Sequence, residues 1–235
     1  MKYYLAVLFT VFSQIALAQE GWNWPDDSVT ARRKVSIFPE MIETSNFAEA
    51  KEHFAWLMEN APDLNVSLYI NGIKLYDSMT AKAVSEDEIK LYSLQLMNLY
   101  DQRIQYFGQK PANYLRKAYS GYKLFKDDKT QLLSQIATTD SALYYNKELA
   151  PDGLFLIAAA QLNKAAKWGL MTDDEVLLQR FDQLLGYYAA KEQADEETEA
   201  KLYSLMNNTI KLDCAKLKSW LMPQLLKNPS DTVLA

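Results

Sequence analysis

Residues 47–63 read FAEAKEHFAWLMENAPD, and this stretch indicates the fold class. Its apolar side chains recur at intervals of three and four residues, as in Ala50, Phe54 and Leu57, so they share one face of an α-helix. The helix is expected to end at Pro62, because proline lacks an amide hydrogen and has a fixed φ. A helix with one apolar face needs a partner to cover that face. The chain is therefore predicted to consist of packed amphipathic helices.

The same pattern continues on both sides of this stretch and predicts five helical hairpins. A short link at 45–46 joins it to an amphipathic segment before it. Ser85 and Glu88 form a predicted capping box, and residues 172–175 form a second. Glycine and proline are sparse, at seven each, and the abundance of Leu, Ala, Tyr, Lys and Glu favours helix over strand. The predicted pairs are 26–44 with 47–61, 66–79 with 85–107, 111–126 with 129–149, 151–169 with 173–193, and 195–211 with 213–227.

The residue pattern of the first two hairpins resembles the tetratricopeptide repeat (TPR). Ala50, Phe54 and Pro62 match the alanine, aromatic and proline positions in the second helix of that repeat. Gly72 matches the small residue of the first helix, which lets a neighbouring helix approach closely. Counterpart residues in successive second helices lie 46 and 43 residues apart, against the family's usual spacing of about 34, which predicts longer helices. These counterparts are Phe54, Tyr100 and Leu143.

Further motifs resemble a group of exported bacterial TPR-like proteins that are mostly uncharacterised in function. They lie at residues 21–25 (GWNWP), 61–72, 99–108, 213–214 and 228–231. The resemblance therefore covers nearly the whole mature chain. It implies an all-α fold of TPR-like hairpins that form an α-solenoid.

Residues 1–18 have the three parts of a secretory signal peptide. Lys2 precedes an apolar run over residues 5–12, and Ala16-Leu17-Ala18 supplies the small residues of a cleavage site. The run is too short to span a bilayer, so no integral membrane span is expected after cleavage. We expect an exported protein in the periplasm, associated with the outer envelope, or secreted. The predicted organisation is a signal peptide at 1–18, a Trp-rich segment at 19–25, the repeat domain at 26–227 and a tail at 228–235.

Charge and cysteine content narrow the class of protein further. The formal net charge is -5, and nucleic acid is not an expected partner because phosphate binding needs clustered Lys and Arg. Cys214 is the single cysteine, which excludes an internal disulfide. Stability is therefore expected to come from packing.

The sequence contains no motif that predicts catalysis. His53 is the single histidine and lies next to Phe54 on a repeat helix, which leaves no multi-histidine metal site or histidine-based triad. Cys214 lies 161 positions further on, and distant repeats of a solenoid do not normally meet. We predict no enzyme activity, no cofactor and no metal. Capping and solvation account for the acidic clusters at 26–27, 127–128, 173–174 and 195–199.

Aromatic side chains are the best candidates for recognition, because a rigid ring with a polar tip gives contact area at a small loss of entropy. If Gly72 marks the crowded face of its helix, then Tyr69, Ile73 and Tyr76 lie on the opposite face and line a groove. Tyr122 is their predicted counterpart in the next hairpin. The alternative is that each of these rings belongs to the core between repeats.

Trp22 and Trp24 leave two interpretations open. They cap the exposed apolar end of the first hairpin, or they present a docking motif to another protein.

These observations predict a non-catalytic exported scaffold that binds a protein or peptide partner in the cell envelope. Two alternatives stay open. One is a carbohydrate-binding helical domain, which needs a compact aromatic platform with nearby carboxylates. The other is a module that self-associates through its C-terminal end at Leu221, Leu225 and Leu226.

Overall fold

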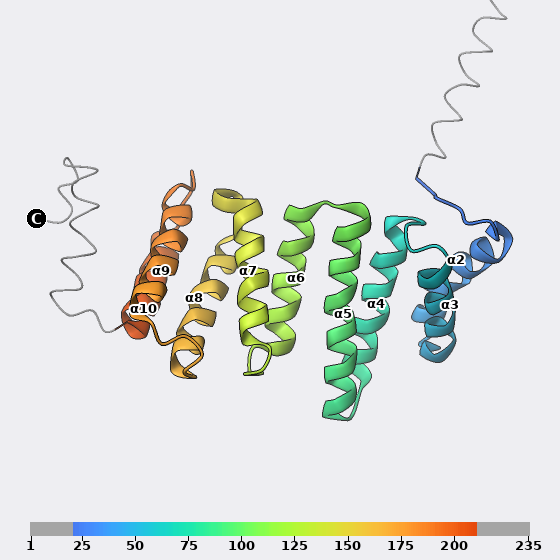
Figure 1. Ribbon diagram of the computed structural model, residues 1–235, viewed down its shortest axis with the longest axis horizontal. Helices are drawn as coiled ribbons and strands as arrows, with labels where there is room; N and C mark the ends of the chain where they lie inside the picture. Colours follow the sequence, from blue (N-terminus) through green and yellow to red (C-terminus); the bar gives the residue numbers. More distant parts are fainter. Residues whose placement is uncertain (1–20, 211–235) are drawn as a thin grey trace, which may run out of the picture. The chain divides into compact units, whose positions relative to one another are not determined.

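The computed structural model describes residues 21–210, and this part of the chain is helical without any strand (Figure 1). It contains nine α-helices and one short 3-10 turn, which confirms the predicted all-α class. The elements are α2 (Ser28–Glu43), α3 (Phe47–Asn60), α4 (Val66–Lys82), α5 (Glu86–Phe107), α6 (Lys110–Phe125), α7 (Leu132–Asn146), η2 (Lys147–Leu149), α8 (Asp152–Lys167), α9 (Asp174–Ala189) and α10 (Glu196–Thr209).

The described part of the chain divides into two compact units, with the boundary between residues 113 and 114, inside α6. We call them the N-terminal unit and the C-terminal unit. In the N-terminal unit α2 packs against α3, α4 packs against α5, and α4 also contacts α2 and α3. In the C-terminal unit α8 contacts α7, α9 and α10. The predicted helices therefore pack against their neighbours along the chain.

The N-terminal unit packs tightly around Gly72 of α4. A Cβ atom added to Gly72 would lie 2.5 Å from Cζ of Phe54 and 3.2 Å from Cδ1 of Leu99. The Phe54 ring in turn stacks on Phe38, with 5.3 Å between the ring centroids. The predicted role of Gly72 as the small residue at a close helix approach is confirmed.

The C-terminal unit is organised around α8, whose sequence is apolar on most of its surface. Leu154, Phe155 and Ala159 of this helix are fully buried, because α7, α9 and α10 cover it from several sides. Phe155 meets Tyr188 of α9 edge to face, with 5.1 Å between centroids. Since its side chains are mostly small or aliphatic, α8 can form the floor of a site between its neighbours.

Ser85 caps α5 as predicted and contacts Glu88, whereas the second predicted capping box has a different capping residue. At α5 the Glu88 amide donates to the Ser85 hydroxyl at 3.2 Å, and this hydroxyl donates to the Glu88 carboxylate at 3.1 Å. At α9 the cap is Asp173 rather than Thr172, and its carboxylate accepts from the amides of residues 175 and 176. A carboxylate serves this position well because it is charged opposite to the positive end of the helix.

Several predicted features lie outside residues 21–210. These are the signal peptide at 1–18, Cys214, the helix at 213–227 with Leu221, Leu225 and Leu226, and the tail at 228–235. Within the described range, no helix combines the length and the hydropathy that crossing a membrane requires.

Candidate functional site

Three residues of the predicted groove lie on α4 and pack against the core of the N-terminal unit. Tyr69 is fully buried, and its ring meets Phe107 edge to face at 5.7 Å. Burial raises the pKa of the Tyr69 hydroxyl far above its usual range, and the hydroxyl oxygen has no hydrogen-bond partner. Ile73 and Tyr76 are half-buried against the same core, and Tyr76 lies edge-on to Phe54. Tyr69 is therefore a core residue, whereas recognition by Ile73 and Tyr76 stays a prediction.

The fourth residue, Tyr122, is half-buried on α6 in the C-terminal unit. It lines a hollow of about 20 Å³ together with Gln135, Gln161 and Lys164. A space of this size has room for about one water molecule. Tyr122 therefore borders a small internal hollow.

The segment that carries Trp22 and Trp24 is attached to the N-terminal unit by several contacts. The two indole rings are stacked, with 5.0 Å between centroids, and the Arg32 guanidinium lies 4.2 Å from the centroid of Trp24. The Asn23 amide donates to the carbonyl of Leu64 at 2.8 Å. Trp24 also packs against the core, while Trp22 is more exposed. These contacts favour the interpretation of Trp24 as a cap, and Trp22 presents the accessible ring of the pair.

The single histidine packs between neighbouring charged side chains. His53 Nδ1 lies 3.4 Å from Nζ of Lys34, and His53 Nε2 lies 3.6 Å from a carboxylate oxygen of Glu49. Within residues 21–210, no three His, Cys, Asp or Glu side chains gather in a way that could hold a metal ion.

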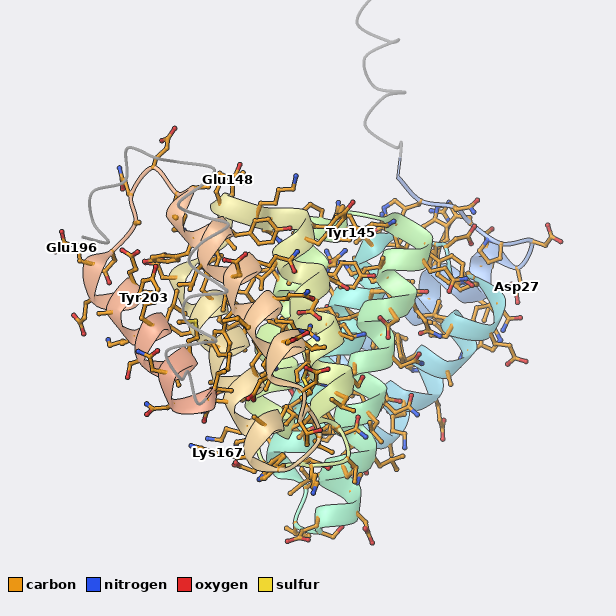
Figure 2. All side chains as sticks on the ribbon, turned by 60° about the vertical axis from the view of Figure 1, so that its left-hand side comes forward. Asp27, Tyr145, Glu148, Lys167, Glu196 and Tyr203 are labelled. Atoms are coloured by element: carbon orange, nitrogen blue, oxygen red, sulfur yellow. The ribbon has the colours of Figure 1, made fainter. Side chains whose placement is uncertain are left out.

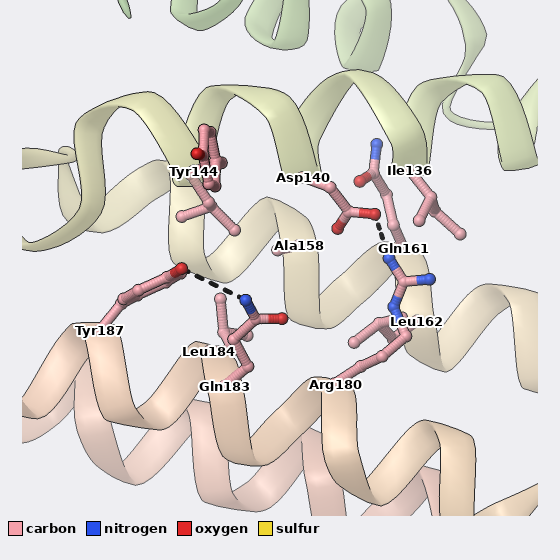
Figure 3. A pocket seen from close by; sticks show the side chains of 11 residues that line it. Ile136, Asp140, Tyr144, Ala158, Gln161, Leu162, Arg180, Gln183, Leu184 and Tyr187 are labelled. Carbon is pink, nitrogen blue, oxygen red and sulfur yellow. Dashed lines mark hydrogen bonds and ion pairs between the residues drawn. The ribbon is translucent and has the colours of Figure 1, made fainter.

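The C-terminal unit has a pocket of about 260 Å³ between α7, α8 and α9 (Figure 3). Helix α8 lies behind it, and α7 and α9 form its two walls. The apolar part of the lining consists of five side chains that are nearly buried: Ile136, Leu143, Ala158, Leu162 and Leu184. The pocket therefore offers an aliphatic surface that spans three helices.

An ion pair crosses this pocket from one wall to the other. The Arg180 guanidinium on α9 donates to a carboxylate oxygen of Asp140 on α7 (Figure 3). The two side chains are 28% and 50% exposed, so the pair is accessible to solvent. Arginine has five N–H donors and a carboxylate has two acceptor oxygens, so one contact leaves further capacity on both sides.

Further polar groups complete the lining. Gln183 Nε2 donates to the Tyr187 hydroxyl at 3.2 Å, and Tyr144 lies on the opposite wall. Gln161 of α8 is only 3% exposed, and its side-chain oxygen has no hydrogen-bond partner. Polar side chains with directed donors and acceptors thus surround the aliphatic surface.

A group of tyrosines adjoins the pocket, and we call Tyr114, Tyr144 and Tyr145 the tyrosine patch. The rings of Tyr114 and Tyr145 are stacked, with 5.4 Å between centroids and 6° between planes. Tyr144 meets Tyr145 edge to face at 5.1 Å, and Tyr144 also lines the pocket. Tyr144 is 62% exposed and Tyr145 is 37% exposed. Figure 2 shows Tyr145 and, in the turn that follows α7, Glu148.

None of the residues predicted as a groove lines this pocket. A signal for it was nevertheless present in the sequence, because Tyr144 and Tyr187 lie 43 residues apart. This equals the interval between Tyr100 and Leu143, two counterpart residues of successive second helices. Asp140 and Arg180 lie 40 residues apart, close to the same interval, and carry opposite charges. A search for matched polar pairs at the repeat spacing would have found these residues.

Compared with known proteins, the chain matches no family model, no curated sequence and no solved structure. What the protein binds therefore depends on the chemistry of these sites.

Proposed function

We propose that this protein is a non-catalytic, exported scaffold that binds a protein or peptide partner in the cell envelope. The observation that carries the proposal is the tyrosine patch, where the exposed rings of Tyr144 and Tyr145 meet edge to face and Tyr145 also stacks on the half-buried Tyr114. Tyrosine is enriched at binding hot spots, because its ring buries a large area and its hydroxyl can still form a hydrogen bond. Stacking restricts the rings before a partner arrives, which lowers the entropy lost on binding.

The proposal includes a solenoid of TPR-like hairpins as the framework. Its support is the packing of helices against their chain neighbours within each unit and the close approach at Gly72. Ala50 and Phe54, two of the residues that match the repeat, are buried. A rigid framework of this kind presents side chains along its surface without folding on binding.

The proposal of export rests on residues 1–18, which have the three parts of a secretory signal peptide. The non-catalytic role is proposed from the surroundings of His53, which packs between Lys34 and Glu49 rather than beside a nucleophile.

A crosslinking capture from the envelope fraction of the native cell tests the proposal. The bait is the full mature chain as wild type, as the double variant Tyr144→Ala, Tyr145→Ala, and as the control Tyr203→Ala. Tyr203 is 41% exposed on α10 and lies outside the patch, so its variant controls for the loss of an exposed ring. We expect one defined partner with the wild type and the control, and at least about a tenfold lower yield with the double variant. Equal yields from all three baits would contradict the proposal, and so would recovery of self-crosslinked protein alone.

Carbohydrate binding is a second candidate, because the patch is an aromatic platform with a carboxylate nearby. Asp140 precedes Tyr144 by one turn of α7, and both line the same pocket. A sugar ring could stack on the exposed face of Tyr144 while the Asp140 carboxylate accepts from its hydroxyls. Glycan-array binding that is lost in Tyr144→Ala, together with no captured protein, would favour this candidate over the scaffold.

A further inference from the structure

We infer that the pocket between α7, α8 and α9 binds a free α-amino acid with an apolar side chain. This inference rests on the pocket and its ion pair, and it does not depend on protein docking at the tyrosine patch.

The size and lining of the pocket select the side chain of the ligand. The volume of about 260 Å³ lies just below the range of about 300–1,000 Å³ that encloses drug-sized ligands. It therefore suits a small ligand. The lining at Leu143, Leu162 and Leu184 is aliphatic, so a leucine-like or phenylalanine-like side chain would replace water there. A sugar fits less well, because hydroxyl groups against these carbons would lose hydrogen bonds to water.

The ion pair selects the charged end of the ligand. Asp140 and Arg180 touch across the pocket, so an anionic and a cationic group lie side by side next to the aliphatic surface. An α-amino acid carries its ammonium and carboxylate on one carbon, so its two charges also lie side by side, like those of Asp140 and Arg180. The carboxylate can accept from the remaining N–H groups of Arg180, while the ammonium donates to the second oxygen of Asp140. The existing pair does not have to break.

This charge arrangement favours a free amino acid over a residue inside a peptide. A peptide residue has neutral amides on both sides, and these would form weaker hydrogen bonds to Arg180 and Asp140 than the charged groups of a free amino acid. The pocket also has more hydrogen-bonding groups than the apolar side chain of a bound peptide would need. Gln161 is almost fully buried at the same pocket with an unpartnered oxygen, and Gln183 and Tyr187 hold each other in place on α9. Such directed groups are typical of a site for a small polar ligand.

Isothermal titration calorimetry with the full mature chain tests the inference through matched ligands. L-leucine is compared with N-acetyl-L-leucine, which lacks the ammonium, with L-leucinamide, which lacks the carboxylate, and with glycine, which lacks the side chain. We expect leucine to bind and each of the other three to bind at least about tenfold more weakly. The inference is overturned if neither leucine nor phenylalanine binds. It is also overturned if the acetylated or amidated compound binds as well as leucine.

Variants locate the binding to this pocket. Ala158→Met fills the aliphatic surface, and Arg180→Met keeps the length of the stem but removes the charge; each is expected to weaken leucine binding at least about tenfold. The matched control is Ala200→Met, at an exposed position of α10. Circular dichroism checks that each variant is folded. The ligand series on the wild type remains decisive if a variant fails to fold. Unchanged leucine affinity in both folded pocket variants would place the site elsewhere and overturn the inference.

Discussion

The two units differ in how many tyrosines they expose. Both units bury aromatic rings in their cores, with Phe54 and Tyr69 in the N-terminal unit and Tyr188 in the C-terminal unit. The C-terminal unit exposes more tyrosines, among them the neighbours Tyr144 and Tyr145 of α7. The same residue type thus serves packing at some positions and is available for recognition at others. The difference depends on what the neighbouring helices leave room for.

Small residues show the same contrast. At Gly72 the space of the missing side chain is occupied by the Phe54 ring. At Ala158 the small side chain lines a pocket of about 260 Å³. A small residue therefore creates either a close helix contact or a cavity, according to whether a neighbouring side chain is long enough to fill the space.

The largest expected effect is the difference in lost stability between removing a buried tyrosine and removing an exposed one. Tyr69→Ala should lower the free energy of unfolding by about 3–5 kcal/mol, because it leaves a cavity in the N-terminal unit. Tyr144→Ala should change it by no more than about 0.5 kcal/mol, because the ring is mostly exposed. Urea unfolding followed by circular dichroism measures both. Similar losses in the two variants would remove the contrast between the units.

A smaller effect separates two helical glycines. Gly72→Ala should destabilise the protein by about 1–3 kcal/mol, because the new methyl group would overlap the Phe54 ring. Gly186→Ala in α9 should stabilise it by about 0.5–1 kcal/mol, because its methyl group meets no atom within 4 Å and alanine favours the helix. Thermal and urea unfolding of the pair give the sign of each change. A stabilising Gly72→Ala would show that the close approach at α4 is looser than described.

Removing only the Tyr69 hydroxyl should cost no stability, unlike removing the whole ring. The buried hydroxyl has no hydrogen-bond partner, so Tyr69→Phe should be neutral or stabilise the protein by up to about 1 kcal/mol. The matched control is Tyr188→Phe in the C-terminal unit. The Tyr188 hydroxyl accepts from the Asp195 amide at 2.9 Å, so this variant should be destabilised. A clear loss of stability in Tyr69→Phe would indicate that the hydroxyl makes a favourable interaction.

The smallest expected effect concerns the acid range, where the two units should behave alike. Asp27 and Asp195 cap α2 and α10, and hydrogen bonds from the side chain and backbone of Thr30 and Thr198 lower the pKa of each carboxyl. A lowered folded-state pKa means that the stabilisation is present above the unfolded-state pKa of about 4 and is lost as the pH falls through the folded-state value. Urea unfolding between about pH 2 and pH 6 should show this loss of stability. The loss should be smaller in Asp27→Asn and in Asp195→Asn. An unchanged pH profile in both variants would contradict the role of these two carboxylates.

Sequence reasoning located most of the helices because their signals are local. The apolar period, Ser85 with its Glu88, and the proline after α3 all act within a few residues, and the observed helices begin and end close to the predicted bounds. The capping residue of α9 was misplaced by one position, because Thr172 and Asp173 are both good caps and only the fold decides between them.

The sequence by itself determined that the described part of the chain is built from helices that pack against their neighbours, and that Gly72 permits a close contact. Only the tertiary structure decided which tyrosines are core and which are exposed, and that Asp140 and Arg180 meet across a pocket. The physical reason is the separation along the chain of the residues that determine each feature. Helix periodicity and caps depend on residues within one or two turns, whereas burial and pocket formation depend on side chains that lie about 40 residues apart along the chain.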